Sequence, residues 1–320
     1  MSRRHARRAQ FAYPAKIDRT HLGIETLSVL TAERKQAEHL SIAEAVIAKV
    51  SICHSGTFLA GAIAPDVDKL LGKHRSSTHW WFPGSDVSGA LRLIQAKPRL
   101  AHATPGSTLQ AFIAGFLCHL VTDEQWTLRI YRKHFGRLTP FSGSRDGADH
   151  QLALQTTLDT ELVIHGKVEG AISELSAHKA CDFERDAYPV LAGDSWAVRP
   201  FVTSVIQRAR EPNPALRVEL MADARRAARR RSTIAAQLGA TTFKRTTDEP
   251  ELMESFLTRL PLLAMVARSL VTIEEIKDFR HEAIRLSTTL IAEFISGEPL
   301  APPDGTSADD YFGSPARTDL

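Results

Sequence analysis

The residues best suited to chemistry in this sequence are a histidine and an aspartate four positions apart, His119 and Asp123, in the run CHLVTD. On an α-helix, residues i and i+4 lie on one face, one turn apart, so both side chains can reach one cation. The surrounding run is apolar, and an unpaired aspartate there would cost on the order of several kcal/mol. A metal ion removes this cost because it holds the imidazole neutral and the carboxylate ionised. An internal His–Asp hydrogen bond, or a helix face lining a polar cleft, would explain the spacing without a metal.

Three other segments offer further metal ligands. Asp66 in APDVD follows Pro65, which ends a helical run, and His79 in SSTHWW has aromatic neighbours that can exclude water. His21 in RTHLGIE lies in the first turn of an expected first helix. Zinc takes imidazole nitrogen and carboxylate oxygen, and a set without thiolates is typical of a catalytic site. The sequence therefore predicts a zinc site formed by His21, Asp66, His79, His119 and Asp123.

His39, in EHLSIAEAVIA, competes with His21 for the histidine contributed by the first part of the chain. A continuous helix over residues 39–63 would place His39 about 36 Å from its far end, at about 1.5 Å per residue. This separation is too large for a contact with Asp66 unless the helix breaks. We therefore favour His21 as the ligand and interpret His39 as an ordinary surface or core histidine.

The elements that must position these residues are helical almost throughout, with few strand patterns. Thr20 is a suitable N-cap for the first helix, and a kink or interruption is expected near Gly56 in the second. The runs FPGSDVSG and LTPFSGSRDG are expected to be loops between helices. The sequence predicts an all-α, single-domain helical bundle. The expected helices cover residues 20–36, 41–65, 108–136, 147–178, 197–209, 214–238, 249–270 and 273–296.

Composition narrows the class of protein. Of the 320 residues, 43% are hydrophobic and 24% are charged, which is the usual balance of a globular protein. The net charge of +3 is small, so the chain as a whole lacks the strong positive potential that attracts nucleic acid. Three widely spaced cysteines argue against a disulfide scaffold and a cysteine zinc site, and they suit a reducing compartment. We see no secretory signal and no apolar run of about eighteen residues. A cytoplasmic protein without a transmembrane segment is expected.

Two tails flank the expected domain. Residues 1–15 are read as a basic disordered tail, residues 16–296 as the metal-binding domain, and residues 297–320 as a proline-rich disordered tail. The arginine-rich run within residues 217–231 is interpreted as a solvated helix face, with a phosphate- or membrane-facing patch as the alternative.

The order of these motifs resembles the zinc-dependent phospholipase C family, which shares an all-helical fold with the S1/P1 nucleases. FLAGAIAPDVDK resembles the family's aspartate-bearing segment, SSTHWW its Ser/Thr-His-aromatic segment, and AFIAGFLCHLVTDEQW its central helix. RTHLGIETLSVL resembles the His-Leu pattern of the first helix. The resemblance, which covers residues 20–136, implies metal-ligand roles for His21, Asp66, His79, His119 and Asp123. In characterised members the aspartate that corresponds to Asp123 commonly bridges two metals.

The chain also departs from the secreted phospholipases, which use an N-terminal tryptophan, freed by cleavage, as a ligand. This chain begins MSRR and looks most like the short, leaderless members of the family. The family's later HxxxE pair corresponds to HGKVE, which supplies His165 and Glu169, although Gly166 weakens a helix there. One zinc ion is the main expectation. A second ion, sharing Asp123 and drawing on His150, His165 and Glu169, is the alternative.

The resemblance implies a metal-dependent hydrolase acting on a phosphodiester, with Asp66 or Asp123 as ligand and proton acceptor. Phospholipid, nucleotide and nucleic acid remain open as substrates, and peripheral contact with a membrane is compatible with the first. Trp80 and Trp81 could line an apolar slot for a lipid chain or stack on a base, with core packing as the alternative. Arg75 could steer a phosphate or lie in a solvated loop.

Two other functions are weighed against this hydrolase. The chain could be a non-catalytic helical binding protein with a degenerate metal site, which the missing second-site ligands favour. An HD-type phosphohydrolase would need an adjacent His-Asp pair, whereas ADHQ has the reverse order.

Overall fold

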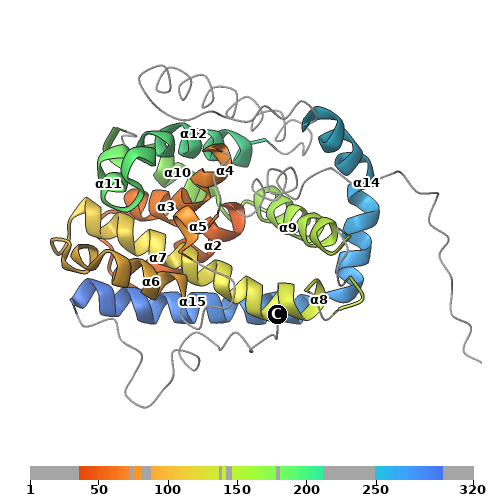
Figure 1. The fold of residues 1–320 in the computed structure, drawn as a ribbon, viewed down its shortest axis with the longest axis horizontal. Coiled ribbons are helices and arrows are strands. Elements are labelled where there is room, and N and C mark those ends of the chain that lie inside the picture. The colour runs from red at the N-terminus through yellow and green to blue at the C-terminus, as the bar shows by residue number, and fades with distance from the viewer. Residues whose placement is uncertain are drawn as a thin grey trace, which may run out of the picture.

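The computed structural model describes residues 36–71, 75–80, 88–136, 139–141, 146–177, 181–211 and 249–297. These residues form an all-α structure without strands, as the sequence predicts (Figure 1). The main helices are α2 (Gln36–Ile47), α3 (Ser55–Ile63), α4 (Val67–Leu71), α5 (Ser76–His79), α6 (Gly89–Ala96), α7 (Thr108–Trp126), α8 (Arg132–His134), α9 (Asp146–Ile164), α10 (Glu169–Ala177), α11 (Cys181–Leu191), α12 (Val198–Ala209), α14 (Glu249–Leu270) and α15 (Ile273–Ser296). Shorter turns are η1 (Ala64–Asp66), η2 (Pro98–His102), the π-helical η3 (Thr127–Tyr131) and η4 (Ala192–Ala197).

The centre of the bundle is the close crossing of α3 and α7. Helix α7 is buried over most of its length, as expected for a helix that is apolar on most sides. Glycines allow the two backbones to touch: a Cβ atom on Gly61 would lie 2.1 Å from the carbonyl oxygen of Phe112. A Cβ atom on Gly115 would lie 1.9 Å from the carbonyl oxygen of Phe58. This contact sets the end of α3, and the η1 turn after it, beside the middle of α7.

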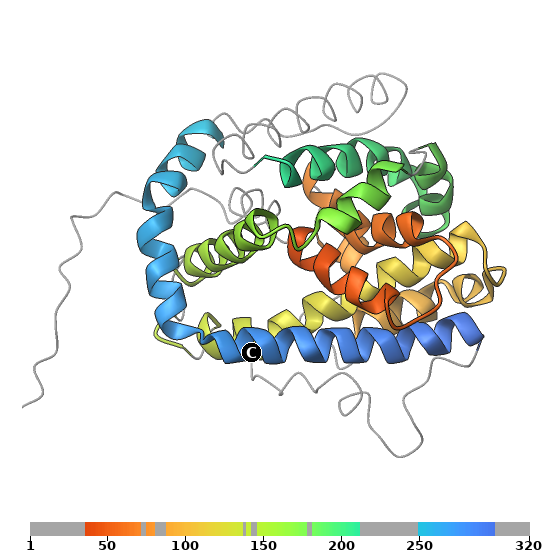
Figure 2. The same ribbon diagram turned by 180° about the vertical axis from the view of Figure 1, so that it is seen from behind.

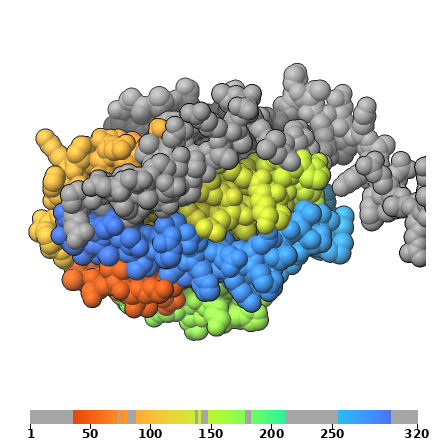
Figure 3. All heavy atoms as spheres, turned by 90° about the horizontal axis from the view of Figure 1, so that it is seen from below, coloured from red at the N-terminus to blue at the C-terminus, as the bar shows by residue number. Residues whose placement is uncertain are grey.

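Helix α15 runs along one side of the bundle and packs against α7 (Figures 1 and 2). It begins with a capping box, in which Thr272 and Glu275 satisfy each other's backbone N–H groups. The ring of Phe279 meets that of Trp126 edge to face, with centroids 5.3 Å apart. Seen from below, α15 and the adjoining part of α14 form a continuous band across the surface (Figure 3). Helix α14 in turn packs against α9.

Several predicted helices have different limits. The predicted helix 41–65 is interrupted over residues 48–54, which end two positions before Gly56, so the interruption expected near that glycine is confirmed. The predicted helix 147–178 is divided by a turn at residues 165–168, where Gly166 has a φ of +64°. Helices α6 and α11 were not predicted.

The later predictions are closer to the structure. Helices α12, α14 and α15 confirm the three expected over 197–209, 249–270 and 273–296. The expected helix 214–238 and the tail 1–15 lie outside the described residues. The expected helix 20–36 and the tail 297–320 also lie outside them, except for Gln36 and Gly297. Among the described residues, no single helix has the length and hydropathy to cross a membrane. The pair Ser255–Leu270 and Ile273–Ser296, bent by 80°, reaches that length and composition only when taken together.

Candidate metal centre

Five histidine and aspartate side chains from four elements meet in the interior of the bundle. We call them the histidine–aspartate cluster: His39 of α2, Asp66 of η1, His79 of α5, and His119 and Asp123 of α7. All five are buried, with exposed fractions between 0 and 6%. Their nitrogen and oxygen atoms form two overlapping groups that could each hold a metal ion, and His119 belongs to both. Four of the five, namely Asp66, His79, His119 and Asp123, are predicted as ligands from the sequence, and the structure brings them together.

The distances within the cluster suit a small cation. The Nε2 atom of His79 lies 3.4 Å from Oδ1 of Asp66 and 3.3 Å from Oδ2 of Asp123. The Nε2 atom of His119 lies 3.8 and 3.5 Å from the same two oxygens, and 3.2 Å from Nε2 of His79. A tetrahedral zinc ion, with bonds of about 2.0–2.2 Å, holds its ligand atoms roughly 3.3–3.6 Å apart. The nitrogen–nitrogen and nitrogen–oxygen distances of 3.2–3.8 Å given above are close to that separation.

Hydrogen bonds on the other side of each ring fix which nitrogen carries the proton. Nδ1 of His119 lies 2.8 Å from the carbonyl oxygen of Ala62, which can only accept, so Nδ1–H is the donor. The hydroxyl of Thr78 donates to the carbonyl oxygen of Arg75 over 3.4 Å and can accept from Nδ1–H of His79 over 2.9 Å. The carbonyl of Ala62 assigns the proton to Nδ1 of His119, and the Thr78 contact accommodates the same tautomer in His79, in which Nε2 of each ring carries a lone pair. In that tautomer, two nitrogen lone pairs face the two carboxylates.

The electrostatics of His119 favour the neutral form required of a metal ligand. Burial lowers the pKa of His119 well below its ordinary value of 6.5, and the neighbouring His39 and His79 lower it further. Asp66 and the hydrogen bond to Ala62 oppose this shift. Carboxylates and unprotonated nitrogens that face each other repel, and a cation between them removes the repulsion.

Two buried side chains orient the ligands from behind. The amide of Gln36 donates to Oδ2 of Asp66 over 2.7 Å, which turns Oδ1 towards the histidines. Oδ2 of Asp68 lies 3.6 Å from Nδ1 of His79 and adds a carboxylate to the side of the ring that carries the proton. Sequence analysis missed both residues, although APDVD contains Asp68 two positions after the predicted ligand Asp66.

His39 lies in the cluster, although the sequence favours His21 as the ligand and an ordinary role for His39. Its ring is stacked on that of His119, and its Nε2 lies 3.5 Å from Oδ1 of Asp123. The distance argument against His39 holds only for a continuous helix over residues 39–63, and the break at residues 48–54 brings α2 back beside α3. His21, which was preferred, lies outside the described residues.

The residues predicted for a second metal are not brought together. His150 is buried near the start of α9, where its ring lies 4.8 Å from that of Phe141. His165 and Glu169 are exposed at the two ends of a turn between α9 and α10, so they do not share a helix face. Among the described residues, the groups of side chains that could hold a metal ion do not include His150, His165 or Glu169.

Trp80 and Arg75, both considered for substrate binding, lie in different surroundings. Trp80, in the left-handed region at φ +55°, packs against the core, and Nζ of Lys97 lies 5.6 Å from its ring centroid. This packing favours the core interpretation of Trp80, while Trp81 lies outside the described residues. Arg75 forms an ion pair with Oδ2 of Asp123, at the edge of the cluster.

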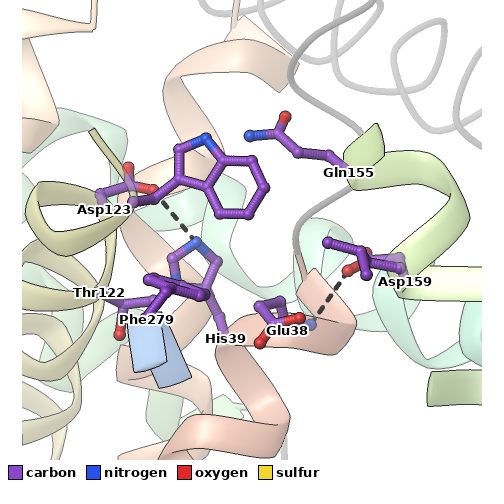
Figure 4. Close-up of a pocket in the computed structure, with 9 residues that line it drawn as sticks. Glu38, His39, Thr122, Asp123, Gln155, Asp159 and Phe279 are labelled. Atoms are coloured by element: carbon purple, nitrogen blue, oxygen red, sulfur yellow. Dashed lines mark hydrogen bonds and ion pairs between the residues drawn. The ribbon is translucent and has the colours of Figure 1, made fainter. Parts of the chain in front are cut away.

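A pocket adjoins the cluster on the side of His39 and Asp123 (Figure 4). It encloses about 260 Å³, part of it open to solvent. Its lining residues are Glu38, His39, Thr122, Asp123, Trp126, Gln155, Leu158, Asp159 and Phe279.

The pocket's two other carboxylates already have partners. The Asp159 carboxylate accepts hydrogen bonds from the backbone N–H groups of Ala37 and Glu38, at the start of α2. Arg280 of α15 binds both carboxylate oxygens of Glu38. The first turn of α2, which carries His39, is thus held by α9 and α15.

Comparison with protein-family models, with curated proteins and with solved structures finds no match for this chain. The resemblance to the zinc-dependent phospholipase C family therefore stays a prediction from sequence motifs. The geometry supports a coarser statement, namely that the buried histidine–aspartate cluster could hold a metal ion.

Proposed function

We propose that this protein is a metal-dependent hydrolase that uses zinc and acts on a phosphodiester, in the manner of a phospholipase C. The observation that carries the proposal is the convergence of two histidine Nε2 atoms and two carboxylates in one buried cluster beside a pocket. Imidazole nitrogen and carboxylate oxygen without thiolate is the ligand chemistry of catalytic zinc sites.

Each residue of the histidine–aspartate cluster has a proposed role. His79, His119, Asp66 and Asp123 would hold the ion, and His39 would complete the set from the pocket side. A zinc ion there would polarise a phosphoryl oxygen and lower the pKa of a water molecule towards neutrality. Asp123 reaches both the cluster and the pocket, which supports a role for its carboxylate in accepting a proton from a nucleophile on the pocket side.

The pocket indicates the form of the substrate. Trp126, Leu158 and Phe279 give it apolar walls, which would exclude water from the reacting phosphate. The 260 Å³ includes open solvent, and the enclosed part of the pocket has room for about one water molecule, so it admits at most one small group of a diester. Phospholipid and nucleotide substrates both meet this requirement, and a phospholipid would bring the protein into peripheral contact with a membrane.

The test combines metal content with activity. Protein purified without chelator or histidine tag is analysed by mass spectrometry, and hydrolysis of bis(p-nitrophenyl) phosphate is measured with and without added zinc. Wild type should hold about one or two zinc ions per chain and hydrolyse the ester. Asp123→Ala should lose both properties, whereas Asp186→Ala, at another buried aspartate, should keep them. Circular dichroism confirms that each variant is folded.

Two outcomes would contradict the proposal. Wild-type protein that takes up no zinc, even after zinc is added, would show that the cluster is not a zinc site. Protein that binds zinc but cleaves neither this ester nor phospholipid and nucleotide diesters would point to a binding protein with a degenerate site.

A further inference from the structure

We propose that Arg75 balances the charge of Asp123 in the metal-free protein, leaves it when the metal binds, and then holds the phosphate of the substrate. This inference rests on the proposed function and assigns a role to a side chain that is not itself a metal ligand. It begins from the ion pair between the Arg75 guanidinium and Oδ2 of Asp123.

The oxygen that Arg75 contacts is the one a cation would need. Oδ2 of Asp123 lies 3.3 Å from Nε2 of His79 and 3.5 Å from Nε2 of His119, so it forms one corner of the ligand set. A guanidinium and a divalent cation on this oxygen compete for its lone pairs and repel each other. Metal binding therefore displaces Arg75, and the ion pair lowers the apparent affinity for the metal.

The backbone of Arg75 is fixed while its side chain has room to move. The Arg75 carbonyl oxygen accepts the backbone N–H of His79 over 2.9 Å, and that of Thr78 over 3.2 Å. These bonds tie the Arg75 main chain to α5 and hence to the ligand His79. The side chain is 43% exposed, so the guanidinium can swing into solvent without leaving the edge of the cluster.

A displaced guanidinium at this edge is suited to phosphate. Its planar fork of N–H donors binds two phosphate oxygens at once, and a phosphate on the metal would carry the negative charge that Asp123 no longer offers. Arg75 thus pairs with the Asp123 carboxylate in the metal-free protein and with the phosphate once metal and substrate are bound. The consequence is a pair of effects with opposite signs: loss of Arg75 strengthens metal binding and weakens phosphate binding.

The experiment measures both affinities by isothermal titration calorimetry. Zinc is titrated into metal-free wild type, Arg75→Gln, Arg75→Lys and Arg129→Gln, and inorganic phosphate is then titrated into the zinc-loaded proteins after free zinc is removed. Arg129 is the matched control because its side chain is 42% exposed and pairs with Glu282, outside the cluster. We expect zinc to bind Arg75→Gln roughly tenfold more tightly, and phosphate roughly tenfold more weakly, than wild type. Arg75→Lys, which keeps the charge without the fork, should stay near wild type for zinc and lose part of the phosphate affinity.

The outcomes separate this inference from the proposed function. Equal zinc affinity in wild type and Arg75→Gln overturns the charge-balancing role, and equal phosphate affinity overturns the phosphate-binding role, in both cases with the zinc site intact. If Arg129→Gln showed the same changes in zinc and phosphate affinity, their cause would be the loss of any surface charge, and the inference would be overturned too. Absence of zinc binding in all four proteins overturns the inference together with the proposed function.

Discussion

The imidazole ring of His39 lies on that of His119, with centroids 3.8 Å apart and an angle of 14° between the planes. This stack joins the first turn of α2 to the middle of α7. It directs Nε2 of His39 to Oδ1 of Asp123, while Oδ2 of the same carboxylate faces His79 and His119. Asp123 is therefore approached by histidines at both of its oxygens.

The first prediction concerns His39. His39→Ala should weaken zinc binding by about tenfold or more, because it removes a nitrogen from the cluster and a ring that packs on His119. A competition titration against a chromophoric chelator measures this change. His165→Ala, at an exposed turn position away from the cluster, should bind zinc like wild type. Equal affinities for the two variants would exclude His39 from the site.

The second prediction concerns the crossing of α3 and α7. Gly115→Ala should destabilise the protein by about 1–3 kcal/mol, because the new Cβ would collide with the backbone of Phe58. Urea unfolding followed by circular dichroism gives the free energy of unfolding. Gly193→Ala is the control, since a Cβ there meets nothing within 4 Å, and its effect should stay within about 0.5 kcal/mol. A Gly115 variant as stable as the Gly193 variant would mean that the helices cross at a greater distance.

The third prediction tests the carboxylate behind His79. Asp68→Asn should lower zinc affinity by about 10- to 100-fold while the protein stays folded, because it removes the negative charge beside Nδ1–H of His79. The same chelator titration measures it. Asp186→Asn changes a buried aspartate of α11 that is outside the cluster and should leave the affinity unchanged. An unchanged affinity in Asp68→Asn would show that Thr78 alone orients the ring.

The fourth prediction is a pH dependence that originates at Glu124, next to Asp123. Burial raises the pKa of Glu124 from its ordinary 4.5 to about 8, although Arg132 opposes the shift. Between these values the unfolded chain releases the proton and the folded protein keeps it, so stability falls as pH rises and the decline ends above about pH 8. Glu124→Gln removes this decline.

Urea unfolding at pH 5 and pH 8.5 checks the prediction for Glu124. The wild type should lose more stability between the two pH values than Glu124→Gln, by on the order of 3 kcal/mol. All other ionisable groups are common to both proteins, so the difference isolates this carboxyl. Parallel losses would show that Glu124 is already ionised at pH 5.

Sequence patterns predict the helical class and most of the cluster because those signals are local. The i, i+4 spacing of His119 and Asp123 and the proline before Asp66 each act within one or two turns. The position of His39 depends on the break at residues 48–54, which read AKVSICH and contain neither glycine nor proline. Gly56, two positions later, signals an interruption, but no local pattern shows that the chain turns back far enough to bring His39 to Asp123. The ion pair between Arg75 and Asp123, 48 positions apart, is set by the packing of α5 on the core and has no sequence signal.

The cluster gathers side chains from α2, η1, α5 and α7, and His79 and His119 alone are 40 positions apart in the chain. A cation held by all of them would act as a reversible cross-link between distant parts of the polypeptide. Because the unfolded chain cannot present these ligands together, the ion would bind the folded state in preference to the unfolded one. The melting temperature of the protein would then follow the free concentration of the ion in its surroundings, and metal starvation would expose the fold to unfolding before any substrate is involved.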